Sequence, residues 1–234
     1  MKKIIFLVLI FVAYTTYAQN YNFSQYERQK KLAQYHDSLE EYDSAIAHYD
    51  AMLSTIGFYP YDYFEAFETA WKQRNINKAN HYLTQGTLTG LDISRWYSKN
   101  IDEFLATKSG LVYLKIKDSL LNVHFENIDK VYFDSLVYLV EIDQKNRDGG
   151  FEMIQNDSLN FEALIRLSEQ KGFPTFPETG YGCNKAWLLL WHHRGESYPN
   201  SNQWQRIIPL IEIKIREGLL KPDFLKMFDD YEEQ

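Results

Sequence analysis

Two copies of a helical motif, 34 residues apart, constrain the fold of this chain more than any other feature. In each copy a turn precedes a helix of small residues, and Ala45 in the first copy corresponds to Ala79 in the second. Asp43 and Asn77, whose side chains suit the start of a helix, keep the same spacing. The spacing therefore predicts two consecutive helical hairpins within residues 19–109.

Each hairpin is expected to pair a first helix with the small-residue helix that follows it. The first helices are predicted at residues 26–39 and 61–74. Ala45 and Ala79 are structural positions in this prediction, because a larger side chain where paired helices approach closely would push them apart. A length of 34 residues is that of the tetratricopeptide repeat, although two generic hairpins could share the spacing by coincidence.

The middle of the chain is expected to end the repeat region. Apolar residues in the stretch 91–129 suggest short helices separated by Gly90 and Gly110. Residues 110–129 are predicted to be a connector, in which 111–116 could instead form a strand.

Residues 130–234 are predicted to form a small C-terminal helical domain. Glycines and capping residues suggest where its helices begin and end. They are expected at residues 133–147, from Asp157 or Ser158 to Gly172, at 186–193, at 202–216, and after Pro222. Pro209 is expected to kink or restart the helix at 202–216. The fold class predicted for the whole chain is therefore all-α.

The first 18 residues have the pattern of a secretory signal peptide. Lys2 and Lys3 precede a short apolar run, and the small residues Thr16 and Ala18 stand at the positions that precede the expected cleavage after Ala18. The longest apolar run further along, Ala186 to Trp191, is too short to span a membrane. The chain is therefore predicted to be exported, to the periplasm or the medium, without a transmembrane segment after cleavage.

Charge and cysteine content exclude some classes of function. The net charge is −7, which argues against a nucleic-acid-binding surface. The single cysteine, Cys183, excludes an internal disulfide and a multi-cysteine metal site.

Several short motifs of the second half resemble those of a known family. They are Asp143-Gln144 with Arg147, Gly172-Phe173-Pro174, Gly180, Ala186 to His192, Ile208-Pro209-Leu210 and Gly218. In this order they resemble exported bacterial proteins with N-terminal tetratricopeptide-like repeats and a C-terminal helical domain of unknown function. The resemblance covers about residues 26–229 and implies no particular activity.

A group of polar residues is the main candidate for chemistry. Asp143 and Arg147 lie four residues apart on one predicted helix, a spacing typical of an intrahelical ion pair. The resemblance implies another role, in which these two residues and Gln144 meet His192 and line a polar pocket. His193 would point in a different direction from His192, so the two histidines are not expected to share a metal ion.

No established catalytic motif is present. The sequence contains no nucleophile elbow, phosphate-binding loop, dinucleotide fingerprint or zinc motif, so neither a cofactor nor a metal ion is predicted. Cys183 near a helix start could serve a cysteine hydrolase, but a small buried thiol explains it more simply. Acidic residues would permit a glycosidase, yet nothing in the sequence singles out a pair.

The sequence is compatible with two functions. The first is a non-enzymatic module of the cell envelope that binds protein or peptide. The alternative is a small envelope hydrolase that uses Asp143, Arg147 and His192.

Overall fold

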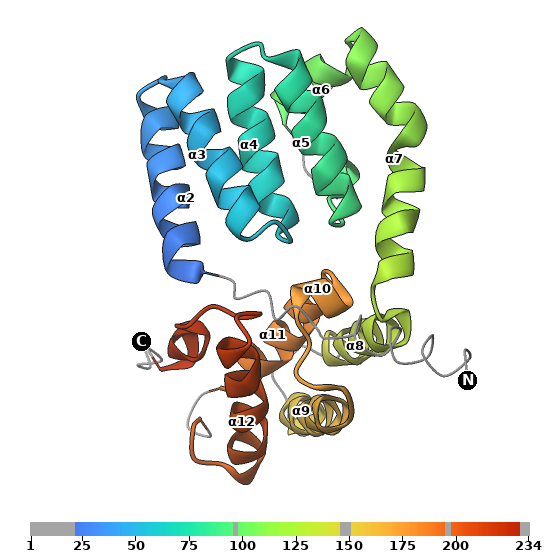
Figure 1. The fold of residues 1–234 in the computed structure, drawn as a ribbon. Coiled ribbons are helices and arrows are strands. Elements are labelled where there is room, and N and C mark those ends of the chain that lie inside the picture. The colour runs from blue at the N-terminus through green and yellow to red at the C-terminus, as the bar shows by residue number, and fades with distance from the viewer. Residues whose placement is uncertain (1–21, 96–97, 146–150, 195–197, 230–234) are drawn as a thin grey trace, which may run out of the picture.

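In the computed structural model, the described residues are 22–95, 98–145, 151–194 and 198–229. Regular structure within these residues is entirely helical, which confirms the predicted all-α class. The helices form two units, one above the other in Figure 1. No helix in the described ranges is long and apolar enough to cross a membrane. The predicted signal peptide lies outside the described residues.

The first unit, called the N-terminal unit here, contains the two predicted hairpins. Its helices are α2 (Phe23–Ser38), α3 (Tyr42–Thr55), α4 (Pro60–Lys72), α5 (Ile76–Leu88), the 3-10 helix η2 (Ile93–Arg95), α6 (Lys99–Leu105) and α7 (Lys108–Asn127). Helices α2 to α5 stand side by side in sequence order (Figure 1), and each packs against the next. Their facing sides form one apolar core, rich in aromatic rings and alanine.

The 34-residue spacing is visible in the backbone of the two hairpins. Glu40 and Arg74 precede the second helix of each hairpin, and both have a positive φ, of 61° and 62°. Ala45 and Ala79 are both fully buried, as expected for positions of close helix approach. The capping residues differ from the prediction, because Glu41 and Asn75 occupy the N-cap positions rather than Asp43 and Asn77.

Replacing Ala45 with leucine is expected to lower the free energy of unfolding by about 1–3 kcal/mol, because the added atoms have no room between the helices. Ala47 on the same helix is exposed and provides the matched control, since leucine there meets solvent. Urea unfolding followed by circular dichroism would measure both variants. Equal stability of the two variants would contradict close packing at Ala45.

The region predicted to be a connector is mostly a single helix. Helix α7 runs unbroken through residues 108–127 and packs against α5, so residues 111–116 are helical rather than a strand. Gly110 does not end a helix. It lies in the first turn of α7, where Thr107 caps the backbone N–H of Gly110, and a Cβ at this position would collide with the backbone at Phe104. The glycine therefore permits close contact between α6 and α7.

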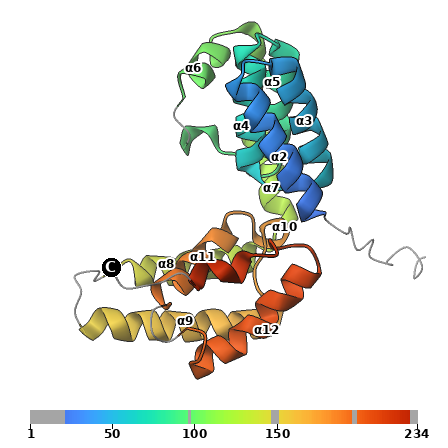
Figure 2. The ribbon, with the colours of Figure 1, turned by 90° about the vertical axis from the view of Figure 1, so that its left-hand side faces the viewer.

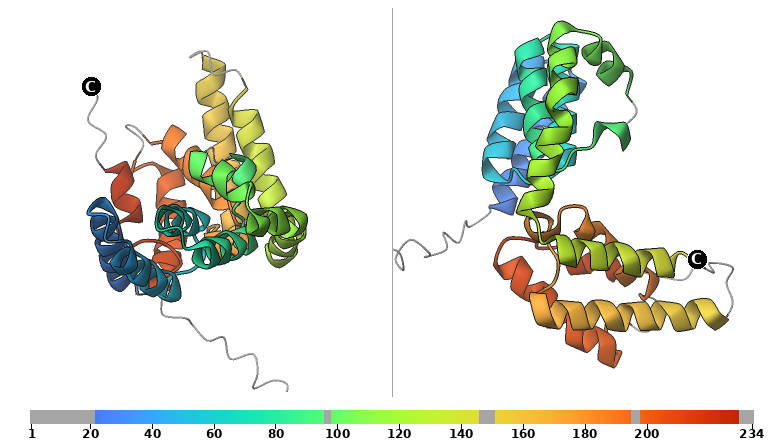
Figure 3. Two further views of the ribbon diagram at one scale, coloured as in Figure 1. Left: turned by 90° about the horizontal axis from the view of Figure 1, so that it is seen from above. Right: turned by 90° about the vertical axis from the view of Figure 1, so that its right-hand side faces the viewer.

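The second unit, called the C-terminal unit here, contains the remaining helices. They are α8 (Lys130–Asp143), α9 (Phe151–Lys171), α10 (Phe176–Thr179), α11 (Gly182–His192), α12 (Asn202–Arg216) and the 3-10 helix η4 (Phe224–Phe228). Helices α8 and α9 run crosswise to the helices of the N-terminal unit (Figures 2 and 3). A second apolar core lies among these helices, with Trp204 as its largest fully buried side chain.

Several helix boundaries in the C-terminal unit differ from the prediction. Helix α9 begins at Phe151, so Asp157 lies inside the helix instead of capping it. Helix α8 ends at Asp143, with Gln144 as its C-cap, rather than continuing to Arg147. Helix α12 matches its predicted bounds and continues through Pro209. The predicted end of α9 is confirmed, because the helix stops at Lys171, directly before Gly172.

The two units meet at His124 on α7. This side chain is 7% exposed and fits between two glycines, Gly90 after α5 and Gly180 before α11. A Cβ at either glycine would approach the Nε2 atom of His124 to 2.7 Å. Just after α7, the backbone N–H of Asp129, the N-cap of α8, donates to the carbonyl of Glu178 in α10 across 2.8 Å. The junction is therefore closely packed around a histidine.

Acidification below about pH 6.5 is expected to destabilise the fold. Burial lowers the pKa of His124 and of His193 below the ordinary value of 6.5, so the unfolded chain binds protons that the native state excludes. For each such histidine, the free energy of unfolding falls by up to about 1.4 kcal/mol for every pH unit below 6.5, until the pKa of the histidine in the folded protein is reached. Urea unfolding at pH 7.5 and 5.5 would measure the change. A His124→Phe variant should show a smaller difference between the two conditions, and an unchanged difference would contradict this role.

Candidate functional site

The polar residues selected from the sequence come together at one end of the C-terminal unit. Asp143, the last residue of α8, lies 2.7 Å through its Oδ2 atom from Nδ1 of His192, the last residue of α11. The side-chain amide of Gln144 donates to the same oxygen across 2.8 Å. The carboxylate is 1% exposed, although the histidine remains partly accessible. Arg147, the fourth predicted member, lies outside the described residues.

Asp157 on α9 adds a second carboxylate to this group. Asp143, Asp157 and His192, called the polar centre here, each offer a ligand atom, and these atoms lie within 4.8 Å of one another. Two carboxylates and an imidazole are ligands that divalent metal ions accept in proteins. The polar centre therefore offers three ligand atoms to a metal ion, an arrangement that the sequence did not predict.

The contact between Asp143 and His192 also suits acid–base chemistry. A carboxylate that accepts a hydrogen bond from Nδ1 keeps the proton on that nitrogen, so that Nε2 carries the lone pair of a general base. The tautomer follows from this hydrogen bond. His193 points elsewhere, with its ring centroid 4.3 Å from that of Phe161.

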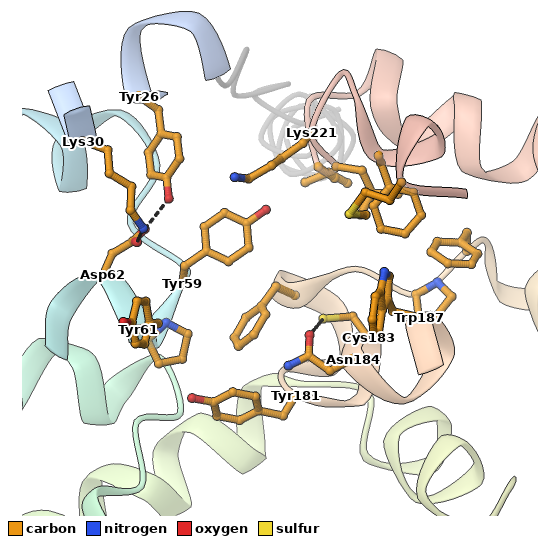
Figure 4. A pocket seen from close by; sticks show the side chains of 18 residues that line it. Tyr26, Lys30, Tyr59, Tyr61, Asp62, Tyr181, Cys183, Asn184, Trp187 and Lys221 are labelled. Atoms are coloured by element: carbon orange, nitrogen blue, oxygen red, sulfur yellow. Dashed lines mark hydrogen bonds and ion pairs between the residues drawn. The ribbon is translucent and has the colours of Figure 1, made fainter. Parts of the chain in front are cut away.

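A second candidate site is a pocket between the two units (Figure 4), called the inter-unit pocket here. Its volume is about 490 Å³, within the usual range for sites that bind small molecules or side chains. Most of its wall is apolar. The aromatic part of the wall consists of Tyr26, Tyr59, Tyr61, Phe173, Phe176, Tyr181, Trp187 and Phe224.

The polar groups at the pocket are held in ion pairs. Asp62 is 1% exposed; it accepts a hydrogen bond from the hydroxyl of Tyr26 at 2.7 Å and one from the ammonium of Lys30 at 2.6 Å. Lys221, from the C-terminal unit, lies 2.6 Å from Glu27 on α2. The ion pair between Lys221 and Glu27 joins the C-terminal unit to α2 and so stabilises the pocket.

Cys183 lies in the pocket wall, at the second residue of α11. Burial raises the pKa of its thiol to about 12, despite its place in the first turn of a helix. The side chain therefore stays protonated near neutral pH. This protonation argues against a cysteine hydrolase, because the thiolate is the nucleophilic form.

Sequence reasoning did not find the inter-unit pocket, since its walls come from segments far apart in the chain. One local signal was available in the run Phe58 to Phe64, which contains five aromatic residues around Pro60. Such a run at a helix start cannot be buried on one face of a single helix. The structure directs part of it toward α10, where the ring of Tyr59 meets that of Phe176 edge to face, with centroids 5.7 Å apart.

Comparison with protein-family models, curated proteins and solved structures gave no match for this sequence. The resemblance to the exported repeat family, and the assignment of the hairpins as tetratricopeptide repeats, therefore stay predictions.

Proposed function

We propose that this protein is a non-enzymatic binding module and that it takes a peptide segment of another protein into the inter-unit pocket. The observation that carries the proposal is the pocket itself, an apolar cavity of about 490 Å³. Pockets of this size with apolar walls and a few polar groups are the usual form of binding sites.

The construction of the pocket supports binding over a purely structural role. Tyr59 and Tyr61 approach it from the N-terminal unit, and Asn184 and Trp187 approach it from α11 (Figure 4). A ligand in this position contacts both units. Tyr59 and Trp187 each pack against the apolar core of their own unit and are only partly buried, so each ring also presents surface to the pocket.

Filling the pocket tests this proposal. Asn184 is exposed in the first turn of α11 and lines the pocket, so Asn184→Trp should block it without disturbing a core. Val131→Trp is the matched control, because Val131 is 70% exposed in the first turn of α8, away from the pocket. Nile red, an uncharged aromatic dye that fluoresces in apolar surroundings, serves as the probe.

The dye is expected to bind the unmodified protein and Val131→Trp, and to bind Asn184→Trp at least tenfold more weakly. Unfolding in urea verifies that both variants are folded. Equal dye binding by all three proteins would show that the pocket does not admit a ligand and would overturn the proposal.

We also propose that the protein is exported to the cell envelope or the medium. The pattern of the first 18 residues supports this location. Mass spectrometry of the protein recovered from a bacterial host tests it, because cleavage after Ala18 leaves Gln19 as the first residue. Recovery of the full-length chain in the cytoplasmic fraction would contradict export.

A small envelope hydrolase is the second candidate function. The 2.7 Å separation of Asp143 and His192 favours it, since an acid–base pair must approach to hydrogen-bonding distance. His192→Gln and Asp143→Asn would each lower hydrolysis of an activated ester such as p-nitrophenyl acetate by about 100-fold or more if His192 acts as the base. His81, which is exposed on α5, provides the control as His81→Gln. Equal rates for all variants would exclude this function for the ester tested.

A further inference from the structure

We propose, relying on the peptide-binding function above, that the inter-unit pocket recognises an uncharged, proline-rich peptide segment in an extended conformation. Three properties of the described pocket residues lead to this ligand class: the balance of charge, the kind of hydrogen-bonding group presented, and the flatness of the walls.

Charge at the pocket is neutralised inside the protein. Lys30 lies 2.6 Å from Asp62 and 3.2 Å from Glu65, and Lys221 lies 2.6 Å from Glu27. A charged ligand group would have to break one of these pairs or remain uncompensated in an apolar cavity, and either is unfavourable. The pocket therefore favours an uncharged segment over a charged chain terminus.

Several side chains at the pocket offer hydrogen-bond donors. Tyr59 carries a hydroxyl, Trp187 an indole N–H and Asn184 an amide NH₂, and Figure 4 shows these side chains around the pocket. Two of the side-chain acceptors are engaged within the protein, since Asp62 accepts from Tyr26 and Lys30 and Oδ1 of Asn184 accepts from the thiol of Cys183 across 3.6 Å. Burial raises the pKa of the Tyr59 hydroxyl, so this group keeps its proton.

A proline-rich segment complements a wall of this kind. Proline has no backbone N–H, so the segment brings carbonyl acceptors and few donors. Any other apolar segment brings one N–H for each residue, and each buried N–H would need an acceptor. The donors of Tyr59 and Trp187 match the carbonyl groups of the proline-rich ligand.

The shape of the walls leads to the same ligand. The ring of Trp187 is stacked on that of Trp191, with centroids 5.3 Å apart and an interplanar angle of 19°, which fixes its orientation. Tyr59 is held by the edge-to-face contact with Phe176. Fixed Tyr and Trp faces are the surfaces on which proline rings pack when extended proline-rich segments bind. Such segments are already ordered before binding, which reduces the entropy lost.

Calorimetry with acetyl-octaproline amide as the probe tests the proposal on the full chain. We expect binding to the unmodified protein and at least tenfold weaker binding of a capped alanine–glutamine peptide of equal length. Tyr59→Phe keeps the ring and removes only the hydroxyl donor, so it should weaken octaproline binding by about threefold to tenfold. Trp187→Phe removes the N–H donor together with one of the two fused rings, so it should weaken binding by at least as much. Tyr138→Phe, at an exposed position on α8, should leave binding unchanged.

The outcomes separate this inference from the binding function on which it rests. If Nile red enters the pocket and Asn184→Trp excludes it, but octaproline fails to bind or binds no better than the alanine–glutamine peptide, the ligand class is wrong and the binding function stands. If Trp187→Phe and Tyr59→Phe bind octaproline as tightly as the unmodified protein does, the claim that the hydrogen-bond donors of these two residues recognise the ligand is overturned. Failure of both dye and peptide would overturn both proposals.

Discussion

Replacing Trp204 with alanine is expected to lower the free energy of unfolding of the C-terminal unit by about 3–5 kcal/mol. This side chain is fully buried. Its ring centroid lies 4.7 Å from that of Tyr198 and 5.0 Å from that of Phe161, and its Nε1–H donates to the carbonyl of His193 across 3.1 Å. Alanine would leave a cavity and an unsatisfied carbonyl, and the loss approaches the total stability of many small domains.

Near-ultraviolet circular dichroism during urea unfolding would measure the effect of Trp204→Ala. Tyr138→Ala removes another aromatic ring from the same unit, but that ring is 62% exposed, so its loss should cost less than about 0.5 kcal/mol. Similar destabilisation by the two substitutions would show that Trp204 does not hold the core together.

Replacing Asp62 with alanine is expected to destabilise the N-terminal unit by about 3 kcal/mol, because it removes one partner of a buried ion pair. The hydroxyl of Tyr26 would lose its acceptor, and Lys30 would lose the nearer of its two carboxylates. Glu65 stays within 3.2 Å of Lys30 and limits the effect to the lower end of the usual range for such pairs.

An exposed ion pair provides the contrast for Asp62→Ala. Asp134 lies 2.9 Å from Lys130 on the surface of α8, where both side chains are more than half exposed. Removing this carboxylate should change the free energy of unfolding by less than about 0.5 kcal/mol. Thermal unfolding of the two variants would compare them, and equal shifts in Tm would contradict the importance of burial at Asp62.

The fold class and the two hairpins could be predicted from the sequence because they depend on local patterns. The buried alanines at 45 and 79 and the helix at 202–216 follow from residue spacing within one segment. Helix α7 was misjudged because Gly110 was interpreted as a break. Gly110 is needed because the backbone at Phe104 approaches it closely. The spacing of apolar residues does not reveal such a contact between neighbouring helices.

The candidate sites could be predicted only in part, because they also depend on contacts between separate helices. Resemblance, rather than residue spacing, indicated that His192 would lie beside Asp143, and their 2.7 Å contact joins the ends of two helices. Asp157 was taken for a capping residue, because the first turns of α9 lack an obvious start signal. The inter-unit pocket depends on how one unit rests on the other. Sequence periodicity describes the faces of single helices and does not specify that arrangement.

Each unit has its own apolar core, so the chain is expected to lose its structure in two steps. Calorimetry would then resolve two transitions, and one melting temperature would describe neither unit. A ligand seated between the units binds only while both are folded, so occupancy raises the free energy of unfolding of the less stable unit, whose unfolding releases the ligand. The more stable unit then unfolds without ligand, and its transition is unchanged. Binding would in this way bring the two transitions together, and the separation between them would report occupancy of the pocket.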